Sequence, residues 1–248
     1  MAEKEWYKDW FADERYLTLY KNRNNDEASE ALDLIERTTS VDKTAAILDL
    51  ACGAGRHSIN LAKRGYNNIT AIDLSPTLIR EAIKQAKCEA VKINFIQQDM
   101  REISGSYDLV INLFTSFGYF DSDEENGSVI ERVANSLRKN GFFVLDFLNA
   151  NLLEKNLIPH DKIVMNESGE TVDLLREIRD GRVEKKIRIS NNDGTATEFH
   201  ESVRLFHLNE LSKMFTDSRL HITSIFGNYD GSPFEEGSSP RLILVAQK

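Results

Sequence analysis

An apolar run that passes through two glycines into an amphipathic stretch occupies residues 47–58, ILDLACGAGRHS. Gly53 and Gly55 let the backbone approach a ligand closely, and the first turn of a helix offers amide donors that have no partner within the helix. The segment therefore predicts a buried strand, a tight loop and a helix, with a polar ligand bound where the loop meets the helix.

From residue 45 onward, short apolar runs alternate with longer amphipathic stretches, a pattern typical of βαβ units and a parallel sheet. Strands are expected at residues 45–50, 68–73, 91–96, 107–114 and 141–148. Helices are expected between them within residues 57–65, 75–90 and 128–141, with about one helical turn between the third and fourth strands. Ser75 is the predicted N-cap of the second helix, with Pro76 at its first position. Gly65 and Gly141 are the predicted ends of the first and third helices.

The pattern changes to period two after Asn151, which predicts an antiparallel β insertion with turns at Asp180-Gly181 and Asn192-Asp193-Gly194. Helical spacing returns at residues 208–218, and two further apolar runs predict strands at 220–229 and 241–248. We interpret the 248 residues as a single α/β domain. Its expected parts are an N-terminal helical segment (1–44, two helices), a core (45–151), the insertion (152–207) and a closing helix with two strands (208–248).

Acidic residues stand at the ends of two further predicted strands. Asp73 ends the second strand, where a carboxylate can accept both hydrogen bonds of a ribose diol. Asp99 and Met100 follow the third strand, where they can contact an adenine amine and ring face. All of these positions lie at carboxyl ends of parallel strands, the crevice in which open α/β sheets bind ligands. The combination predicts a site for a nucleoside cofactor.

The residues around the glycines distinguish two such cofactors. A dinucleotide fold requires a third glycine where Ser58 stands, and Asp49 would repel a pyrophosphate but can bind an amino group. Together, DLACGAG, Asp73 and Asp99-Met100 resemble the class I S-adenosylmethionine-dependent methyltransferase family, whose first motif has this acidic residue before GxG. The resemblance covers about residues 45–148 well and the rest more loosely. YDLVINLFTSFGYF (107–120) and the tail from residue 226 are most similar to glycine and amino-sugar N-methyltransferases.

The resemblance implies a Rossmann-like methyltransferase fold, with a doubly wound, seven-stranded, mostly parallel sheet and the antiparallel insertion. It also implies S-adenosylmethionine as cofactor and S-adenosylhomocysteine as product. The glycines would pass the methionine part, Asp73 would hold the ribose, Asp99 and Met100 would frame adenine, and Asp49 would organise the loop or reach the amino group. The residues assigned to the cofactor are Asp49, Gly53, Gly55, Asp73, Leu74, Asp99, Met100 and Leu113, with Tyr16, Tyr20 and Arg23 from the N-terminal segment.

The N-terminal segment is rich in aromatic residues: six of the chain's 22 lie in the first 20 positions. Such a segment needs an apolar surface to cover. The resemblance implies that it closes over the cofactor as a lid, which makes Tyr16, Tyr20 and Arg23 candidates for contact. The alternative for Trp6 and Trp10 is packing against the sheet or a dimer interface.

Methyl transfer depends mainly on in-line positioning and exclusion of water, so a sequence motif for a catalytic base need not exist. The catalytic residue stays unknown, with His57, Tyr119, His200 and Tyr229 as candidates. Other residues expected near the acceptor follow the fourth strand (Phe114, Thr115, Ser116, Phe117) or the sixth (Asp230, Phe234), if the sixth strand runs parallel to the first five. For Phe114 and Phe117 the alternative is a place in the core, and for Asp230-Gly231 it is a plain turn.

Composition narrows the function further. The formal net charge of −9 disfavours an unaided nucleic-acid binder. After the fourth strand, Asn112-Leu113-Phe114-Thr115 lacks the proline motif of base-amine methyltransferases. A small-molecule nitrogen or oxygen acceptor is therefore expected, with a monomer or homodimer and no nucleic-acid or membrane partner. Histidine and cysteine spacing predicts no metal site.

The two cysteines and the lack of a long apolar segment predict a cytoplasmic protein. Two alternative functions stay open at this point. Gly53, Gly55 and Asp73 would also suit an NAD(P)-dependent oxidoreductase, and a non-catalytic cofactor-binding module of the same fold is not excluded by any residue.

Overall fold

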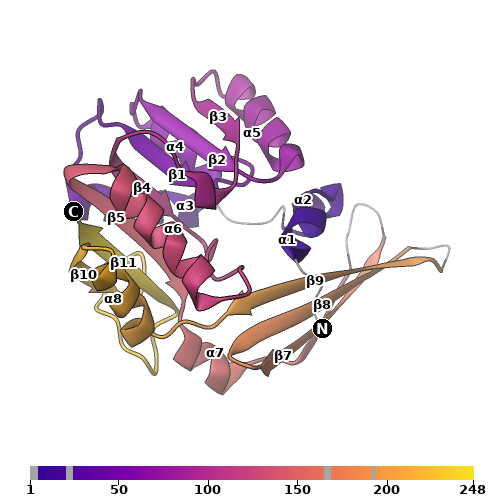
Figure 1. Ribbon diagram of the computed structural model, residues 1–248. Coiled ribbons are helices and arrows are strands. Elements are labelled where there is room, and N and C mark those ends of the chain that lie inside the picture. The colour runs from indigo at the N-terminus through magenta and orange to yellow at the C-terminus, as the bar shows by residue number, and fades with distance from the viewer. Residues whose placement is uncertain (1–4, 21–24, 165–168, 192–193) are drawn as a thin grey trace.

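The computed structural model describes residues 5–20, 25–164, 169–191 and 194–248, so the predicted turn residues Asn192 and Asp193 lie outside it. In this part of the chain the strands form two sheets (Figure 1). The larger has seven strands in the order β10-β11-β5-β4-β1-β2-β3. Its strands are β1 (Ile47–Leu50), β2 (Ile69–Asp73), β3 (Asn94–Gln97), β4 (Tyr107–Asn112), β5 (Leu137–Leu148), β10 (His221–Phe226) and β11 (Arg241–Gln247).

The pairing confirms the predicted α/β class and the mostly parallel sheet. Strands β1 to β5 pair in parallel with one another, and β11 is antiparallel to both β5 and β10. Strand β10 therefore runs in the same direction as the first five, as expected. The loop that follows β10 thus begins at the carboxyl edge of the sheet.

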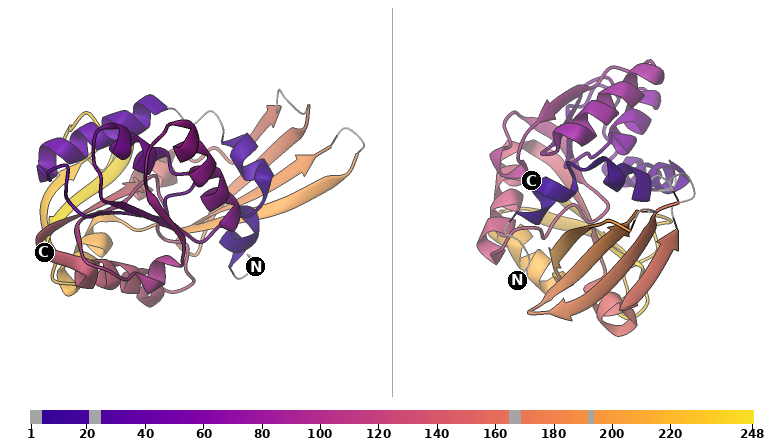
Figure 2. Two further views of the ribbon diagram at one scale, coloured as in Figure 1. Left: turned by 90° about the horizontal axis from the view of Figure 1, so that it is seen from above. Right: turned by 90° about the vertical axis from the view of Figure 1, so that its right-hand side faces the viewer.

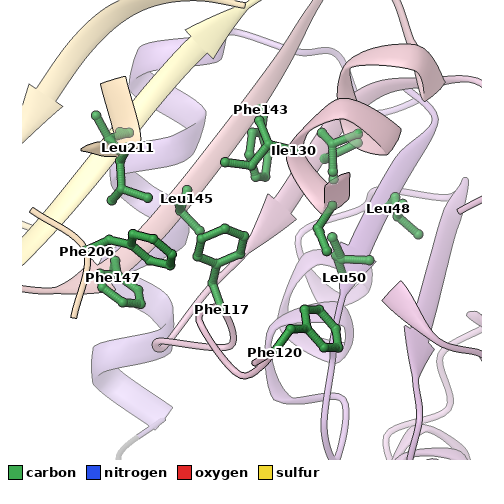
Figure 3. Packing of buried hydrophobic residues seen from close by; sticks show 14 of the residues in the cluster. Leu48, Leu50, Phe117, Phe120, Ile130, Phe143, Leu145, Phe147, Phe206 and Leu211 are labelled. Atoms are coloured by element: carbon green, nitrogen blue, oxygen red, sulfur yellow. The ribbon is translucent and has the colours of Figure 1, made fainter. Parts of the chain in front are cut away.

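Helices cover both faces of this sheet because its strands alternate their apolar side chains between the two sides. On one side α6 (Asp123–Ser136) and α8 (Leu208–Asp217) pack over Leu48, Val110 and Leu145 (Figure 3). On the other side α3 (Asn25–Thr39) and α4 (Arg56–Lys63) pack over residues such as Ile47 and Ile111. The remaining core helices are α5 (Pro76–Cys88) and the short 3-10 helix η1 (Met100–Glu102) between β3 and β4.

The predicted start of α5 is confirmed. The Ser75 side chain accepts a hydrogen bond from the Leu78 backbone N–H at 3.2 Å, and Pro76 occupies the first turn. Gly65, with φ of 94°, follows directly after the end of α4 and its C-cap.

The predicted role of Gly141 as a helix terminator is wrong, because α6 ends at Ser136 and Gly141 lies within β5. The left-handed residue nearest to it is Asn140, with φ of 65°, which also lies within β5. A Cβ at position 141 would lie 3.0 Å from the Arg138 carbonyl oxygen and 3.2 Å from that of Asp108. Glycine is therefore required there for a close approach of backbone to backbone.

Three helices, and not the expected two, lie in the described part of the first 45 residues: α1 (Trp6–Trp10), α2 (Glu14–Leu19) and α3. Asp13 separates the first two, because its carboxylate accepts from the Arg15 backbone N–H and starts a new helix. Helices α1 and α2, called the lid below, lie apart from the large sheet, whereas α3 covers it (Figure 1).

The predicted antiparallel insertion is confirmed as a separate four-stranded sheet, β6-β7-β8-β9, which extends from the core beside the lid (Figure 2). It follows a helix that was not predicted, α7 (Ala150–Asn156). The Asp180-Gly181 turn has φ of 51° and 71°, as a tight hairpin requires. The strands are β6 (His160–Val164), β7 (Thr171–Arg179), β8 (Arg182–Ser190) and β9 (Ala196–Arg204).

None of the helices in the described ranges combines the length and the apolar character needed to cross a membrane.

The two glycines of the loop after β1 allow a matched test of packing. Both have positive φ, but a Cβ on Gly53 would meet no atom of the described residues within 4 Å, whereas one on Gly55 would lie 3.0 Å from the Ala82 Cβ and 3.1 Å from the Phe95 ring. We expect Gly53→Ala to lower the free energy of unfolding by about 1 kcal/mol and Gly55→Ala by about 2–4 kcal/mol. Urea unfolding followed by circular dichroism measures both, and equal losses would contradict the packing argument.

Candidate functional site

A cavity of about 880 Å³ lies along the carboxyl edge of the large sheet, between the loops after β1, β2, β3 and β4 and the lid. Most of the residues predicted to bind a cofactor line it. These are Gly53, Asp73, Leu74, Asp99, Met100 and Leu113 from the core, with Tyr16 and Tyr20 from the lid. Asp49 and Gly55 lie behind the wall, and Arg23 is outside the described residues.

The carboxylate of Asp73 joins the ends of β1 and β2. One oxygen accepts from the Gly53 backbone N–H and the other from the Ser75 backbone N–H, each at 2.8 Å. The side chain is 8% exposed, and burial raises its pKa. Asp73 thus holds the glycine loop against the N-terminus of α5 while it borders the cavity.

Asp49 lies beneath the glycine loop and is 2% exposed. It accepts a hydrogen bond from the Ser58 hydroxyl at 2.5 Å, and Ser58 stands where a dinucleotide fold would need glycine. Burial raises the pKa of Asp49 to about 6, and the charge of Asp73 adds to this effect. The two carboxyl groups therefore make this end of the cavity favourable for a positively charged ligand group.

Asp99 caps η1 and forms an ion pair with Arg101, whose Nη2 lies 2.7 Å from a carboxylate oxygen. Burial tends to raise the pKa of Asp99, but the hydrogen bonds from Arg101 outweigh it and hold the pKa below its usual range. Arg101 in turn lies over the Phe120 ring, 4.3 Å from its centre. The Asp99 carboxylate is therefore ionised and held in a defined orientation at the cavity wall.

The loop after β4 supplies the part of the wall beside the glycine loop, because β4 pairs with β1. Phe114 and Ser116 line the cavity, whereas Phe117 is 1% exposed and belongs to the core, as its alternative interpretation stated (Figure 3). The Phe114 ring lies 4.6 Å from the Arg56 guanidinium and 6.5 Å from the His57 ring. The two loops therefore approach each other across the end of the cavity.

The lid is attached to the core by its connecting segment. The Ser75 hydroxyl donates to the Phe11 carbonyl at 2.5 Å, and the Thr77 hydroxyl donates to the Ala12 carbonyl at 2.8 Å. Its aromatic rings pack on Tyr119, with Trp6 at 5.2 Å and Phe11 at 5.8 Å between ring centres. These contacts close the cavity on the side of α1.

A second attachment joins the lid to the insertion. The Glu201 carboxylate on β9 accepts from Trp10 Nε1 at 2.7 Å and from the Tyr20 hydroxyl at 3.0 Å, and it pairs with Lys185 at 3.0 Å. The Trp10 ring packs on Phe199 with centres 4.6 Å apart. Among the described residues, the insertion contributes no side chain to the cavity wall, so it acts on the cavity through the lid.

Sequence reasoning missed Glu201 and Lys185. The register pairs them directly across β8 and β9. The sequence alone does not reveal this pairing, because Lys185 and Glu201 stand in the same alternating pattern as charged residues that form an exposed ion pair. The pairing can be recognised only when the register of the hairpin is known. Trp6 and Trp10 are buried and do not line the cavity, in line with the packing alternative.

The four catalytic candidates separate into two groups. His57 and Tyr119 line the cavity. His200 lies on β9 opposite Lys186, away from the cavity wall. Tyr229 is 4% exposed and donates its hydroxyl to Asp146 at 2.6 Å. Burial, and then the charge of Asp146, raise the pKa of the Tyr229 phenol, which therefore stays protonated.

The remaining residues expected near an acceptor lie elsewhere. Asp230 accepts from the Ser232 backbone N–H at 2.8 Å in an exposed turn, and Phe234 packs against the core. Within the described ranges, no three histidine, cysteine or acidic side chains gather as a metal site would require.

Comparisons with known proteins agree with this geometry. Residues 47–141 match a family described as a methyltransferase domain. The chain is 26% identical over 237 residues to dTDP-3-amino-3,4,6-trideoxy-alpha-D-glucopyranose N,N-dimethyltransferase of Streptomyces venezuelae, covering 87% of this chain and 92% of that protein. It is 38% identical over 104 residues to a putative methyltransferase of Geobacillus sp. strain WCH70, covering 40% of this chain and 41% of that protein.

A solved structure has the same fold. The S-adenosylmethionine-dependent methyltransferase from Clostridium acetobutylicum ATCC 824 superposes with a TM-score of 0.78 at 18% identity, covering 92% of this chain and 94% of that one.

The raised pKa of Asp49 predicts how stability depends on pH. The folded-state pKa of Asp49 is near 6, above the ordinary value of 3.8. The contribution of the protonated Asp49 side chain to the stability of the wild-type protein is therefore complete below pH 4 and is lost as the pH rises through 6. Asp49→Asn cannot ionise, so we expect its unfolding free energy relative to wild type to rise by about 2–3 kcal/mol between pH 4 and pH 7. The constant cost of the amide cancels in this comparison. Urea unfolding at both pH values measures it, and a pH-independent difference would show that Asp49 titrates normally.

Proposed function

The chain belongs to the class I S-adenosylmethionine-dependent methyltransferases, and we propose that it methylates an amine nitrogen on a small molecule. The observation that carries the proposal is that the glycine loop, Asp73 and Asp99 border one cavity at the carboxyl edge of the parallel sheet. Two buried carboxyl groups, Asp73 at the cavity wall and Asp49 behind the glycine loop, suit a cofactor with an ammonium and a sulfonium group.

Each part of the cofactor has a proposed partner on the cavity wall. Gly53 allows the methionine part to approach the backbone, and Gly55 and Asp49 shape the loop from behind. The Asp73 carboxylate accepts hydrogen bonds from the ribose hydroxyls through lone pairs that are not used by the Gly53 and Ser75 backbone N–H groups. The adenine end lies between Leu74 and Met100 beside Asp99, Leu113 borders the methionine end, and Tyr16 and Tyr20 cover the cavity.

Bound S-adenosylmethionine would supply an activated methyl group, because its sulfonium sulfur is a leaving group that departs as a neutral thioether without assistance from an acid or base. The protein's contribution is then to align the acceptor and exclude water, which is worth about 7–11 kcal/mol when the geometry is good. Tyr7, Phe11 and Tyr119 form an aromatic side of the cavity that keeps water out. His57 and Tyr119 are the candidates whose positions allow them to orient an acceptor or take its proton.

The nature of the acceptor follows from size, charge and relatives. A cavity of about 880 Å³ lies within the range usual for small-molecule sites. The Streptomyces venezuelae relative is named for N,N-dimethylation of a nucleotide-linked amino sugar, which supports nitrogen over oxygen. A net charge of −9 supports the absence of a nucleic-acid partner.

The proposal further includes a cytoplasmic location, suggested by two free cysteines, with no membrane partner and with a monomer or homodimer as the active form. The comparisons lend no support to an NAD(P)-dependent oxidoreductase. Ser58 replaces the third glycine of that fingerprint, and its hydroxyl is used by Asp49.

Asp73→Ala tests the assignment of the ribose. Because two hydrogen bonds to a charged acceptor are lost, we expect the Kd for S-adenosylhomocysteine to rise by about 10- to 100-fold. Isothermal titration calorimetry measures this change. Asp33→Ala, an exposed carboxylate on α3 whose partner is Arg64, serves as the control and is expected to leave the Kd unchanged. An unchanged Kd for Asp73→Ala would remove Asp73 from the cofactor site.

Transfer of a labelled methyl group from S-adenosylmethionine tests the acceptor class. The panel contains a dTDP-linked amino sugar, glycine and sarcosine, and matched hydroxyl compounds that lack the amine. We expect N-methyl products on an amino acceptor and none on its hydroxyl counterpart. Methylation of hydroxyl compounds alone would overturn the nitrogen assignment, and cofactor binding without any product would favour the non-catalytic module.

A further inference from the structure

Asp146 is a fully buried carboxylate that has no part in the proposed cofactor contacts or methyl transfer. Asp146 lies in β5 with no exposed surface, and its side chain accepts three hydrogen bonds. The donors are the Tyr229 hydroxyl at 2.6 Å, the Phe114 backbone N–H at 2.8 Å and Arg241 Nε. One side chain thus connects the loop after β4 with two residues from the C-terminal part of the chain.

The loop that Asp146 holds has an unusual backbone. Phe114 and Thr115 both have φ of 63°, a left-handed conformation that costs free energy for any residue other than glycine. The surroundings must compensate for two such residues in succession. The Phe114 N–H binds the Asp146 carboxylate, and the Thr115 N–H donates to the Asp146 backbone carbonyl at 3.0 Å.

Arg241 adds a third hold on the same loop. Its Nη2 donates to the Thr115 hydroxyl at 3.2 Å, and its guanidinium lies 5.1 Å from the centre of the Phe114 ring. Arg241 is itself largely buried. Its guanidinium and the Asp146 carboxylate therefore neutralise each other next to the strained residues.

The conformation of this loop determines the shape of one end of the cavity. Phe114 and Ser116 line the wall, and the Phe114 ring faces Arg56 at the start of α4. Asn112 Nδ2 donates to the Leu50 carbonyl at 2.9 Å and to the Ser116 carbonyl at 3.2 Å, which links the loop to the end of β1. A change at residues 114 and 115 therefore alters the wall beside the glycine loop.

We propose that Asp146 is a positioning residue that holds the Phe114–Ser116 wall in its left-handed conformation, with Tyr229 and Arg241 as its partners, and thereby sets affinity for the methionine half of the cofactor. The proposal rests on the S-adenosylmethionine site and is independent of the acceptor. It gives Tyr229 a role as a hydrogen-bond donor in place of the catalytic role considered from the sequence.

Asp146→Asn tests the proposal, and Asp108→Asn is a matched control. Asp108 also accepts from a backbone N–H, that of Ala46 at 2.8 Å, and from an arginine, Arg138 Nη1 at 2.6 Å, but it lies at the start of β4, away from the cavity. We expect Asp146→Asn to raise the Kd for S-adenosylhomocysteine by about 10- to 100-fold, and Asp108→Asn to change it less than about twofold.

Adenosine, which lacks the methionine part, locates the effect. We expect its Kd to change less than about twofold in Asp146→Asn. Amide hydrogen exchange, read on the peptide spanning 113–119, should become faster in Asp146→Asn than in the control. An equal loss of affinity for adenosine would overturn the proposal, because the defect would then extend over the whole cavity.

Tyr229→Phe keeps the ion pair and removes one donor, so it remains informative if Asp146→Asn fails to fold. We expect a rise of about 3- to 10-fold in the Kd for S-adenosylhomocysteine, with faster exchange in the same peptide. A lower unfolding midpoint with unchanged Kd and unchanged exchange would mean that the cluster only stabilises the fold, and would overturn the proposal. Failure of the wild-type protein to bind S-adenosylhomocysteine would count instead against the proposed function.

Discussion

Two backbone hydrogen bonds to the Asp73 carboxylate join the ends of β1 and β2, and the geometry of the cavity depends on them. Without this bridge the backbone N–H of Gly53 would lose its hydrogen-bond acceptor. The bridge also holds a loop whose backbone is left-handed at Ala51, Gly53 and Gly55. Because the carboxylate is buried, each bond is stronger than it would be in water. The same burial brings the acidic groups of Asp73 and Asp49 close together, and a cationic ligand would reduce the electrostatic repulsion between them.

The lid completes the cavity from the other side, and it depends on elements that are remote in sequence. The core holds it through hydroxyl groups of Ser75 and Thr77 at the start of α5, and the insertion holds it through Glu201. The charge of Glu201 is matched by Lys185 across the hairpin. In the part of the chain that the structure describes, the four-stranded sheet therefore supports the lid, and none of its residues lines the cavity.

Sequence patterns were sufficient for the strands of the large sheet, the N-cap at Ser75 and the residues at the strand ends, because each is set by local chemistry and period. They failed where the deciding contact is non-local. Gly141 resembles a helix terminator in sequence, but the approach of Asp108 and Arg138 carbonyls determines its place in β5. Asp146, between aromatic residues in an apolar run, gives no local sign that Tyr229 and Arg241 will meet it. The aromatic enrichment of the first 20 residues predicts that this segment covers an apolar surface, but it does not predict that Glu201 on β9 binds it.

The attachment of the lid to the insertion also bears on how the chain folds. The hydrogen bonds from Trp10 and Tyr20 to Glu201 close loops of 191 and 181 residues. Closing such long loops costs conformational entropy, which contacts near in sequence do not require. During synthesis the aromatic segment leaves the ribosome well before its partner on β9, which lies 181 to 191 residues later in the chain. The α/β core can therefore form before the lid is attached to the insertion, and until then Trp10 and Tyr20 lack the Glu201 carboxylate as a hydrogen-bond acceptor.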